Sequence, residues 1–356
     1  YSLVWVALVC AQACPGLFLR DVARAQVPPA QPEAAVPPPL YLGESDAFAG
    51  PAAVPRAVAV DLIPTWPRWF AGASGLVMTR TLGDGSATMQ PLGGVQLDTA
   101  DASASWPGGV DLHLGRWLGQ RQHHAVEFIY WGVYGMGSTS AVTSMPPNAI
   151  EVIPQAVDVS VAGQPAEEYL VGAAAQSITR SDLVNDVEVN WVYALWNRPE
   201  FLPRDRTISL MWLAGFRFFE IEDVLTLTTT PGDASLGPST LNVATNNNLY
   251  GGQVGAKFDW RFMESVRFTA VPKFLLAGNA ITNTATFASS SGDFATFGDG
   301  APVNVHSTLG VFSWLGSVDT GVAWDVTDHW TLSVGYRVVG VGNIAQADGQ
   351  WPTVIA

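Results

Sequence analysis

Apolar and polar residues alternate with a period of two along most of the chain after Trp66. This period is typical of β-strands, whose successive side chains point to opposite faces. In residues 250–262, for example, Phe258 and Trp260 share one face while Asp259 lies on the other. The pattern predicts nine strands, over residues 69–80, 109–118, 125–134, 183–195, 207–218, 250–262, 266–276, 312–326 and 330–338.

One residue breaks the pattern. Pro272 lies inside the predicted strand 266–276. Because proline has no N–H to donate to a ladder, we expect a β-bulge at this position.

Long and short links alternate strictly between the nine predicted strands. The long links are 81–108, 135–182, 228–249 and 277–308, and the short ones are 119–124, 196–206, 263–265 and 327–329. A soluble β-sandwich also has alternating strands, but this asymmetry of links is typical of outer-membrane barrels, which have tight periplasmic turns and long outer loops. We therefore predict an all-β protein, a transmembrane antiparallel β-barrel of about ten strands.

The start of the chain resembles an export signal. Residues 2–19 are apolar and contain both cysteines, Cys10 and Cys14, and Ala23-Arg24-Ala25 follows as an A-x-A cleavage site. We expect residues 1–25 to be a signal peptide with a truncated n-region, because no basic segment precedes the apolar run. An uncleaved signal anchor is an alternative, and a lipid anchor on either cysteine is a weaker one.

Residues 26–60 are rich in proline and alanine and poor in large apolar groups, so they predict an extended periplasmic linker. A Pro-rich ligand for a groove-binding partner is the alternative. The barrel itself is then expected over residues 61–356.

The count of nine strands also predicts a gap. Bacterial single-chain barrels have an even number of strands, and the ninth strand would end on the outer side. We expect a truncated tenth strand, with the first and ninth strands facing each other across a gap about one strand wide. Residues 343–356 read as the start of another outer loop.

Charge and composition narrow the function. Only 13% of the residues are charged, 11% are aromatic, and 35 of the 356 residues are glycine. This composition is typical of proteins made of strands and turns. The net charge of −14 argues against a nucleic-acid partner, because binding a phosphate backbone requires clustered lysine and arginine.

The polar residues opposite the apolar faces are the candidate functional residues. If the apolar faces meet lipid, these residues face the lumen, because a charge facing lipid at the midplane costs about 2–4 kcal/mol. They would either set the selectivity of a pore or fill a narrow barrel with ion pairs, which the small number of strands favours. The lumen-facing candidates are Asp111, Glu127, Glu188, Arg217, Lys257, Asp259, Arg261, Lys273, Asp319 and Arg337. The residues expected to face outward are Trp212, Phe258, Trp260, Trp314, Tyr336 and Val338.

Three groups of residues invite a chemical interpretation, and none fits well. His306 and Ser307 could serve a lipid hydrolase, but neighbours on a strand point to opposite faces. His123 and His124 lie in a short turn, where solvation explains them without a metal. Asp98, Asp101 and Asp111 could hold calcium, but the EF-hand glycine and closing glutamate are missing. We expect no catalytic residues, no cofactor and no metal, and hence no enzyme.

Several stretches, taken in order, resemble a known family. They are Trp69-Phe70-Ala71-Gly72 through Met78-Thr79-Arg80, Glu127 to Tyr134, Leu210 to Phe219, Asn247 to Gly251 with Gln253 and Gly255, and Gly335 to Val339. Together they are similar to the family named putative β-barrel porin seven, exported barrels found mainly in planctomycete bacteria. The resemblance implies an outer-membrane barrel with a porin-like role in a Gram-negative-type cell envelope, and it supplies no catalytic residues.

The sequence therefore predicts an outer-membrane β-barrel that acts as a porin-like passive channel or as a structural barrel. The alternative is a surface adhesion or scaffold protein anchored by its barrel, and a lipid hydrolase is the third hypothesis. The expected partners are membrane lipid and the outer-membrane assembly machinery, with a homo-oligomer as a further possibility.

Overall fold

The computed structural model describes residues 2–15, 68–82, 85–90, 96–119, 122–144, 150–153, 155–194, 207–327 and 330–356, with residues 2–15 described for the backbone alone. Contacts divide the chain into a unit of residues 1–17 and 68–356 and a unit of residues 18–67, and the second unit, with the predicted linker, lies outside the described residues. None of the described helices has the length and apolar character needed to cross a membrane.

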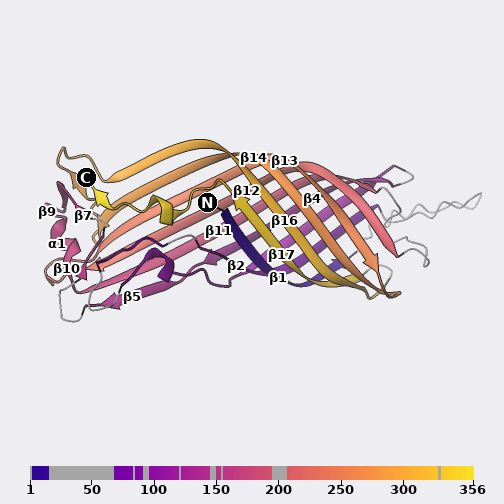
Figure 1. Cartoon of the computed structure of the whole chain (residues 1–356), viewed down its shortest axis with the longest axis horizontal. Helices are drawn as coiled ribbons and strands as arrows, with labels where there is room; N and C mark the ends of the chain where they lie inside the picture. Colours follow the sequence, from indigo (N-terminus) through magenta and orange to yellow (C-terminus); the bar gives the residue numbers. More distant parts are fainter. Residues whose placement is uncertain are drawn as a thin grey trace, which may run out of the picture. The chain divides into compact units, whose positions relative to one another are not determined.

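All nine predicted strands are present, and each is antiparallel to its neighbours (Figure 1). They are β2 (Trp69–Arg80), β3 (Gly108–Leu118), β4 (His124–Met136), β11 (Ala175–Ala194), β12 (Ile208–Thr230), β13 (Ser239–Arg261), β14 (Val266–Ser289), β16 (Asn304–Asp325) and β17 (Trp330–Gly342). The short links join the strands at one end, which we call the turn end. The long links join them at the other, the link end.

Strands β11, β12, β13, β14 and β16 extend further toward the link end than the hydropathy pattern indicated. Each has between 20 and 24 residues, and the added parts pair without a break, as in Thr226 with Asn242 and Asn242 with Thr286. Many of the outward positions there are threonine, asparagine or serine, so the apolar alternation fades while the backbone ladder continues. The long links are correspondingly shorter than predicted.

The first and ninth predicted strands, β2 and β17, lie one strand apart as expected, but the position between them is occupied by a strand of this chain, so it is not an open gap. Strand β1 (Ser2–Pro15) lies between β17 and β2, antiparallel to both, so β2 and β17 do not pair directly. Because β11 also pairs with β12, the ten strands close into a ring. This differs from the prediction of a truncated tenth strand, in which the position is empty and residues 2–15 belong to a signal peptide. Cleavage after Ala25 stays a prediction, since that site lies outside the described residues.

The bulge expected at Pro272 is wrong. Strand β14 keeps one register against β13 on both sides of the proline, from Lys273 opposite Gly255 to Ala270 opposite Phe258. Against β16 the register is also continuous, with Pro272 opposite Val318. The missing N–H is accommodated by a short lapse in pairing with β13, without an extra residue.

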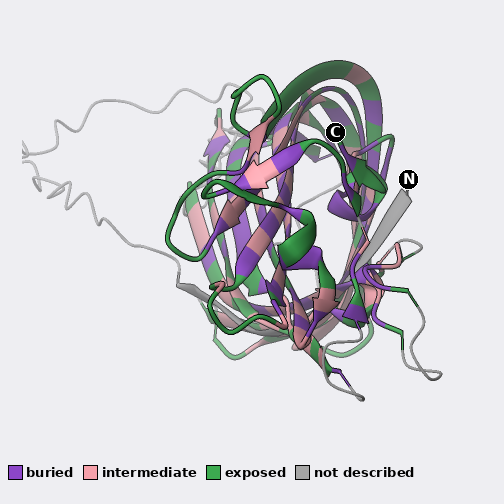
Figure 2. Ribbon diagram, turned by 90° about the vertical axis from the view of Figure 1, so that its left-hand side faces the viewer, coloured by how far each residue is buried: buried purple, intermediate pink, exposed green. Residues whose placement is uncertain are grey.

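The links fold into a cap at the link end. Its elements are η1 (Thr99–Asp101), β5 (Thr139–Thr143), β6 (Ile150–Glu151), β7 (Gln155–Ala156), β8 (Val159–Val161), β9 (Gln164–Pro165), α1 (Glu167–Leu170), β10 (Val171–Ala173), β15 (Thr296–Phe297), η3 (Ala347–Gln350) and β18 (Val354–Ile355). Apolar cap residues such as Met89, Tyr169 and Trp351 form one buried cluster with Leu225 and Phe287 of the wall. Figure 2 looks onto this end, where the link segments lie across the ring of strands.

Candidate functional site

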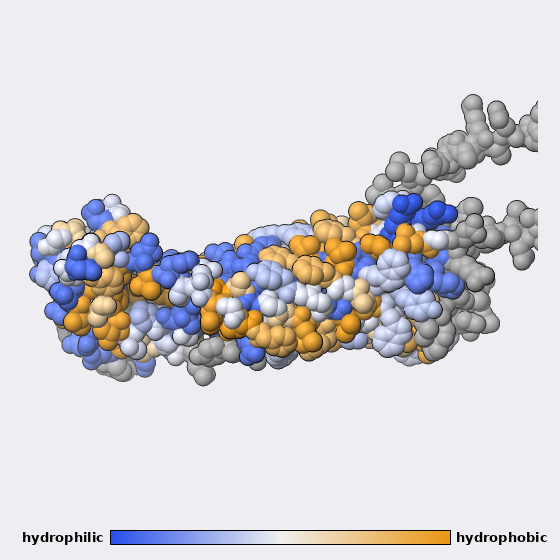
Figure 3. Space-filling model, turned by 90° about the horizontal axis from the view of Figure 1, so that it is seen from above, coloured by the Kyte–Doolittle hydropathy of each residue, from blue (hydrophilic) through white to orange (hydrophobic). Residues whose placement is uncertain are grey.

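The outer surface of the barrel carries an apolar belt near the turn end. On β12 the outward positions from Ile208 to Phe218 are apolar or aromatic, and the next two outward positions are Glu220 and Glu222. These eleven residues match the length of a tilted membrane-spanning strand. The structure places all six predicted outward residues on this face, with Trp212 and Trp260 about half exposed (51% and 48%). Figure 3 shows hydrophobic residues gathered over this part of the surface.

The inner face of the wall alternates between apolar and ionic layers. Along β12 from the turn end, the inward residues are Met211 and Leu213, then Arg217, then Phe219 and Ile221, then Asp223, then Leu225 and Leu227. The apolar residues of this series belong to three separate buried clusters. Strand β11 repeats the order, because Val192, Glu188, Val184, Asp182 and Ile178 follow one another on its inner face. The lumen is therefore packed in successive layers.

All ten predicted lumen-facing residues lie on the inner face, and each lies close to a residue of opposite charge. In one group Asp111 contacts His113 Nε2 at 2.6 Å and Arg337 Nη2 at 2.7 Å. In the same group the Glu127 carboxylate accepts hydrogen bonds from Lys257 Nζ at 2.6 and 2.7 Å. The contacts of Asp111 with Arg337 and of Glu127 with Lys257 each join strands that are three places apart in the ring, and so they tie non-neighbouring strands together across the lumen.

A second group centres on Glu188. Lys273 Nζ donates to both Glu188 oxygens at 2.9 Å, and Gln253 Nε2 donates to the same carboxylate at 2.8 Å. Arg217 Nε donates to Asp186 at 2.6 Å, while Arg337 bonds Asp319.

Near the turn end the remaining two predicted residues, Asp259 and Arg261, form looser pairs with Arg267 and Asp325. Asp325 lies 3.3 Å from Arg261 and 3.0 Å from Arg267, and Arg267 Nε lies 3.8 Å from Asp259.

The charges of the central layer balance to within one charge, and they balance fully when His113 is protonated. Five carboxylates (Asp111, Glu127, Asp186, Glu188 and Asp319) face four permanent cations (Arg217, Lys257, Lys273 and Arg337) and His113. Burying ions in this way costs desolvation, which only close partners offset. The pairing accordingly leaves at most one charge in excess to select ions in a pore.

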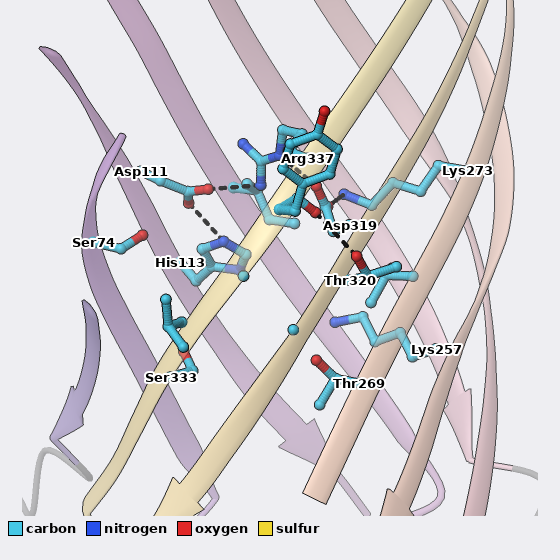
Figure 4. A pocket seen from close by; sticks show the side chains of 16 residues that line it. Ser74, Asp111, His113, Lys257, Thr269, Lys273, Asp319, Thr320, Ser333 and Arg337 are labelled. Carbon is cyan, nitrogen blue, oxygen red and sulfur yellow. Dashed lines mark hydrogen bonds and ion pairs between the residues drawn. The ribbon is translucent and has the colours of Figure 1, made fainter. Parts of the chain in front are cut away.

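A small cavity lies within this layer, with a volume of about 140 Å³ (Figure 4). Asp111, His113 and Ser74 face it from one side of the barrel, and Lys257 and Thr269 from the other. On its link-end side the lumen is filled by an apolar layer that includes Trp131 and Phe219, each at most 1% exposed. The guanidiniums of Arg337 and Arg217 lie over these two rings at 5.1 and 5.6 Å, so the ionic and apolar layers are in direct contact.

Comparison with known protein families gives one match over most of the chain. Residues 84–355 match the model of a family described as Putative beta barrel porin-7. The chain belongs to this family. Among solved structures, the outer membrane protease OmpT from Escherichia coli is similar over 96% of this chain and 94% of its own, with 8% sequence identity and a TM-score of 0.35. No curated protein matches the sequence.

In this barrel porin-7 chain a second ionic layer lies nearer the link end, and sequence reasoning missed it. Arg80 contacts Asp182 at 2.7 Å and Asp223 at 3.0 Å, and Arg180 contacts Asp223 at 2.9 Å and Asp348 at 2.7 Å. Arg180 and Asp182 precede the predicted strand 183–195, although they continue its inward parity. The sequence pattern does not indicate that Asp348 faces the lumen, because this residue lies in a segment predicted to be an outer loop.

That segment, residues 343–350, folds into the link end of the lumen. Asn247 of β13 bonds Ala345 twice, donating to its carbonyl at 2.8 Å and accepting from its N–H at 2.9 Å. Asp223 accepts from the N–H of Ala347 at 3.0 Å. The expectation of an exposed loop at 343–356 is therefore wrong for its first part, because inward polar side chains of the wall capture its backbone.

The other chemical candidates do not converge into a site. Asp98 and Asp101 cap each other around η1, and Asp111 lies in the lumen, so the calcium arrangement does not form. His306 and Ser307 lie on strand β16, where successive side chains point to opposite faces. His124 accepts a hydrogen bond from Trp191 Nε1 at 3.2 Å on the outer surface. Within the described ranges, no group of three or more His, Cys, Asp or Glu side chains could hold a metal ion.

Proposed function

We propose that this protein is a structural outer-membrane barrel whose lumen is closed to solutes, with membrane lipid around its belt and the outer-membrane assembly machinery as its insertion partner. The observation that carries the proposal is the order of layers along β11 and β12, in which apolar side chains that exclude water alternate with paired charges. Ten strands enclose little more space than side chains can fill. The proposal includes no catalytic role.

Electrical recording on the purified protein tests this proposal. Inserted into planar bilayers in concentrated KCl, the wild-type barrel should give no stable ohmic steps, whereas an open sixteen-stranded porin in the same bilayers should give them. Heat-modifiable migration in gels, which reports a folded barrel, shows that the silent protein has inserted correctly. Uniform ohmic steps from the wild-type protein would overturn the proposal and restore the passive channel.

The cap supports a second candidate function, a surface scaffold anchored by the barrel. The apolar cluster that joins Met89, Ile150, Val161 and Trp351 to the wall gives the cap a core of its own at the end opposite the short turns. A barrel that serves only to seal its own lumen does not need so much folded structure there. If the cap carries the function, a variant in which a short turn replaces residues 150–173 should still form a folded, heat-modifiable barrel. Antibodies raised against the cap should then no longer bind whole cells that express this variant. Loss of the folded barrel itself would show that the cap is a structural element of the wall.

A further inference from the structure

Above the apolar belt, the outward face of β11, β12, β13, β14 and β16 carries rows of hydroxyl and amide side chains, which we call the collar. Cross-strand register aligns one row over six strands, with β5 at its edge: Thr139, Thr179, Thr226, Asn242, Thr286 and Asn304. Thr139 and Thr179 share a hydrogen bond of 2.9 Å, and Asn242 donates to Thr226 at 3.0 Å. The side chains are half-exposed or exposed, so the row presents further donors and acceptors outward.

The collar is almost free of charge. Between the belt and this row, on the same face of the described strands, Glu220 and Glu222 are the acidic residues, His306 is the one histidine, and no lysine or arginine occurs there. An exposed protein surface is ordinarily about 25–35% charged. Anionic lipid headgroups would favour lysine and arginine near the surface. The collar therefore suits a neutral, hydroxyl-rich partner better than bulk water or phosphate.

The height of the collar indicates where that partner lies. Thr226 follows Phe218, the last apolar outward residue of β12, by eight positions. At ~3.3 Å per residue and a tilt of ~45°, it stands about 19 Å above the belt. Phospholipid headgroups reach only about 5–8 Å beyond the hydrocarbon. The row thus lies above ordinary headgroups, on the surface that continues the lipid belt.

Tyrosines mark the border between belt and collar. Tyr250 is 42% exposed there and stacks on Phe218 with ring centroids 6.0 Å apart. The hydroxyls of Tyr130 and Tyr134 both donate to Asn185, at 3.2 and 2.9 Å. Their apolar rings face lipid while their polar ends join the collar, which fixes the depth at which the polar partner begins.

From these observations we propose that the collar binds the saccharide headgroups of neutral glycolipids in the outer leaflet. Sugar hydroxyls donate and accept at the spacing of neighbouring strands, and the rows of Thr and Asn offer both functions along a curved but continuous face. The proposal rests on the position of the belt and is independent of whether the lumen conducts.

The test measures which lipids the barrel retains. The protein is reconstituted into vesicles of a neutral diacylglycerol glycolipid whose headgroup of four hexoses is long enough to reach the row, a phosphatidylcholine and a phosphatidylglycerol, all with identical acyl chains. After gentle extraction, its bound lipids are quantified by mass spectrometry. The wild-type protein should be enriched in the glycolipid relative to the vesicles. The triple variant Thr179→Val, Thr226→Val and Thr286→Val should lose that enrichment, since each lost hydrogen bond lowers it by roughly 2- to 10-fold.

Matched controls keep the result interpretable. Valine preserves the β-branched shape, and heat-modifiable migration verifies that the variant is folded. Thr320→Val changes an outward threonine within the belt and should leave the enrichment unchanged. Equal retention of the three lipids by the wild-type protein would mean that the collar is only hydrated. Preference for phosphatidylglycerol, or loss of glycolipid with Glu220→Gln and Glu222→Gln alone, would indicate an ionic site and overturn the proposal.

Discussion

At Arg217 a guanidinium lies between two carboxylates in the middle of the lumen. Its Nε is 2.6 Å from Asp186 and its Nη1 is 3.8 Å from Glu188, and all three side chains are at most 1% exposed. Lys273 contacts the same Glu188 from β14. No one of these ions could be tolerated here alone, because the desolvation of each is offset only by its partners. The lumen is consequently sensitive to the loss of single charges.

The first prediction concerns this pair. Arg217→Met keeps the length of the side chain but leaves the Asp186 carboxylate without its partner, so we expect a loss of about 3–5 kcal/mol in the free energy of unfolding. Arg217→Met combined with Asp186→Asn removes both charges and should recover much of that loss. Urea titration of the barrel in lipid vesicles measures both values. Equal losses in the single and double variants would show that packing, and not charge, dominates this layer.

Strand β12 contacts two environments, the packed lumen on its inner face and lipid or water on its outer face. Its inward residues follow the layers of the lumen along the whole strand, while its outward residues are apolar up to Phe218 and polar from Glu220 onward. The same ladder therefore passes from lipid to water without any change in backbone structure. The edge of the membrane is therefore visible only in the change of the outward side chains from apolar to polar.

A second prediction uses two outward positions of this strand. Ala214 lies near the middle of the belt, so Ala214→Arg should lower the free energy of unfolding by about 2–4 kcal/mol, because arginine there faces hydrocarbon. Glu222→Arg, on the same face above the belt, should cost about 0–1 kcal/mol. Urea titration of the two variants in lipid vesicles measures both losses of unfolding free energy. Similar costs at the two positions would displace the belt from residues 208–218.

The sequence predicted the elements well where lipid imposes a strict alternation, and less well elsewhere. Nine of the ten strands of the ring are predicted from their belt segments, β1 being the exception, and the parity of those segments places all ten lumen candidates on the inner face. Parity could not show how far a strand continues once its outward residues become Thr and Asn, so Arg180 and Asp182 were left in a link. It also could not identify partners such as Asp223 and Asp348, because those contacts depend on how the links fold back.

At the scale of the whole molecule, the ring is closed by a strand that hydropathy alone assigned to another role. Residues 2–15 are apolar without a polar face, so their pattern fits an export signal as well as a strand. In the ring they pair on both sides, with β17 over positions such as Leu8 opposite Tyr336 and with β2 over positions such as Val9 opposite Leu76. Without a strand in this position, β2 and β17 would expose unpaired backbone to lipid, at a cost of several kcal/mol for each group.

The last prediction tests this closure by cross-linking. In a background of Cys10→Ser and Cys14→Ser, the 356-residue chain carrying Leu8→Cys and Tyr336→Cys should form a disulfide after refolding into detergent, because register partners on neighbouring strands bring Cβ atoms to about 4.5–5.5 Å. Leu8→Cys with Val334→Cys, two residues out of register, should cross-link poorly. Direct cross-linking between β2 and β17, with none to residue 8, would show that the ring closes with nine strands and that residues 2–15 lie elsewhere.

The mass of the protein taken from outer membranes separately tests cleavage after Ala25. If residues 1–25 are removed there, the position between β2 and β17 must be filled by something other than β1, since an open edge is not tolerated in hydrocarbon.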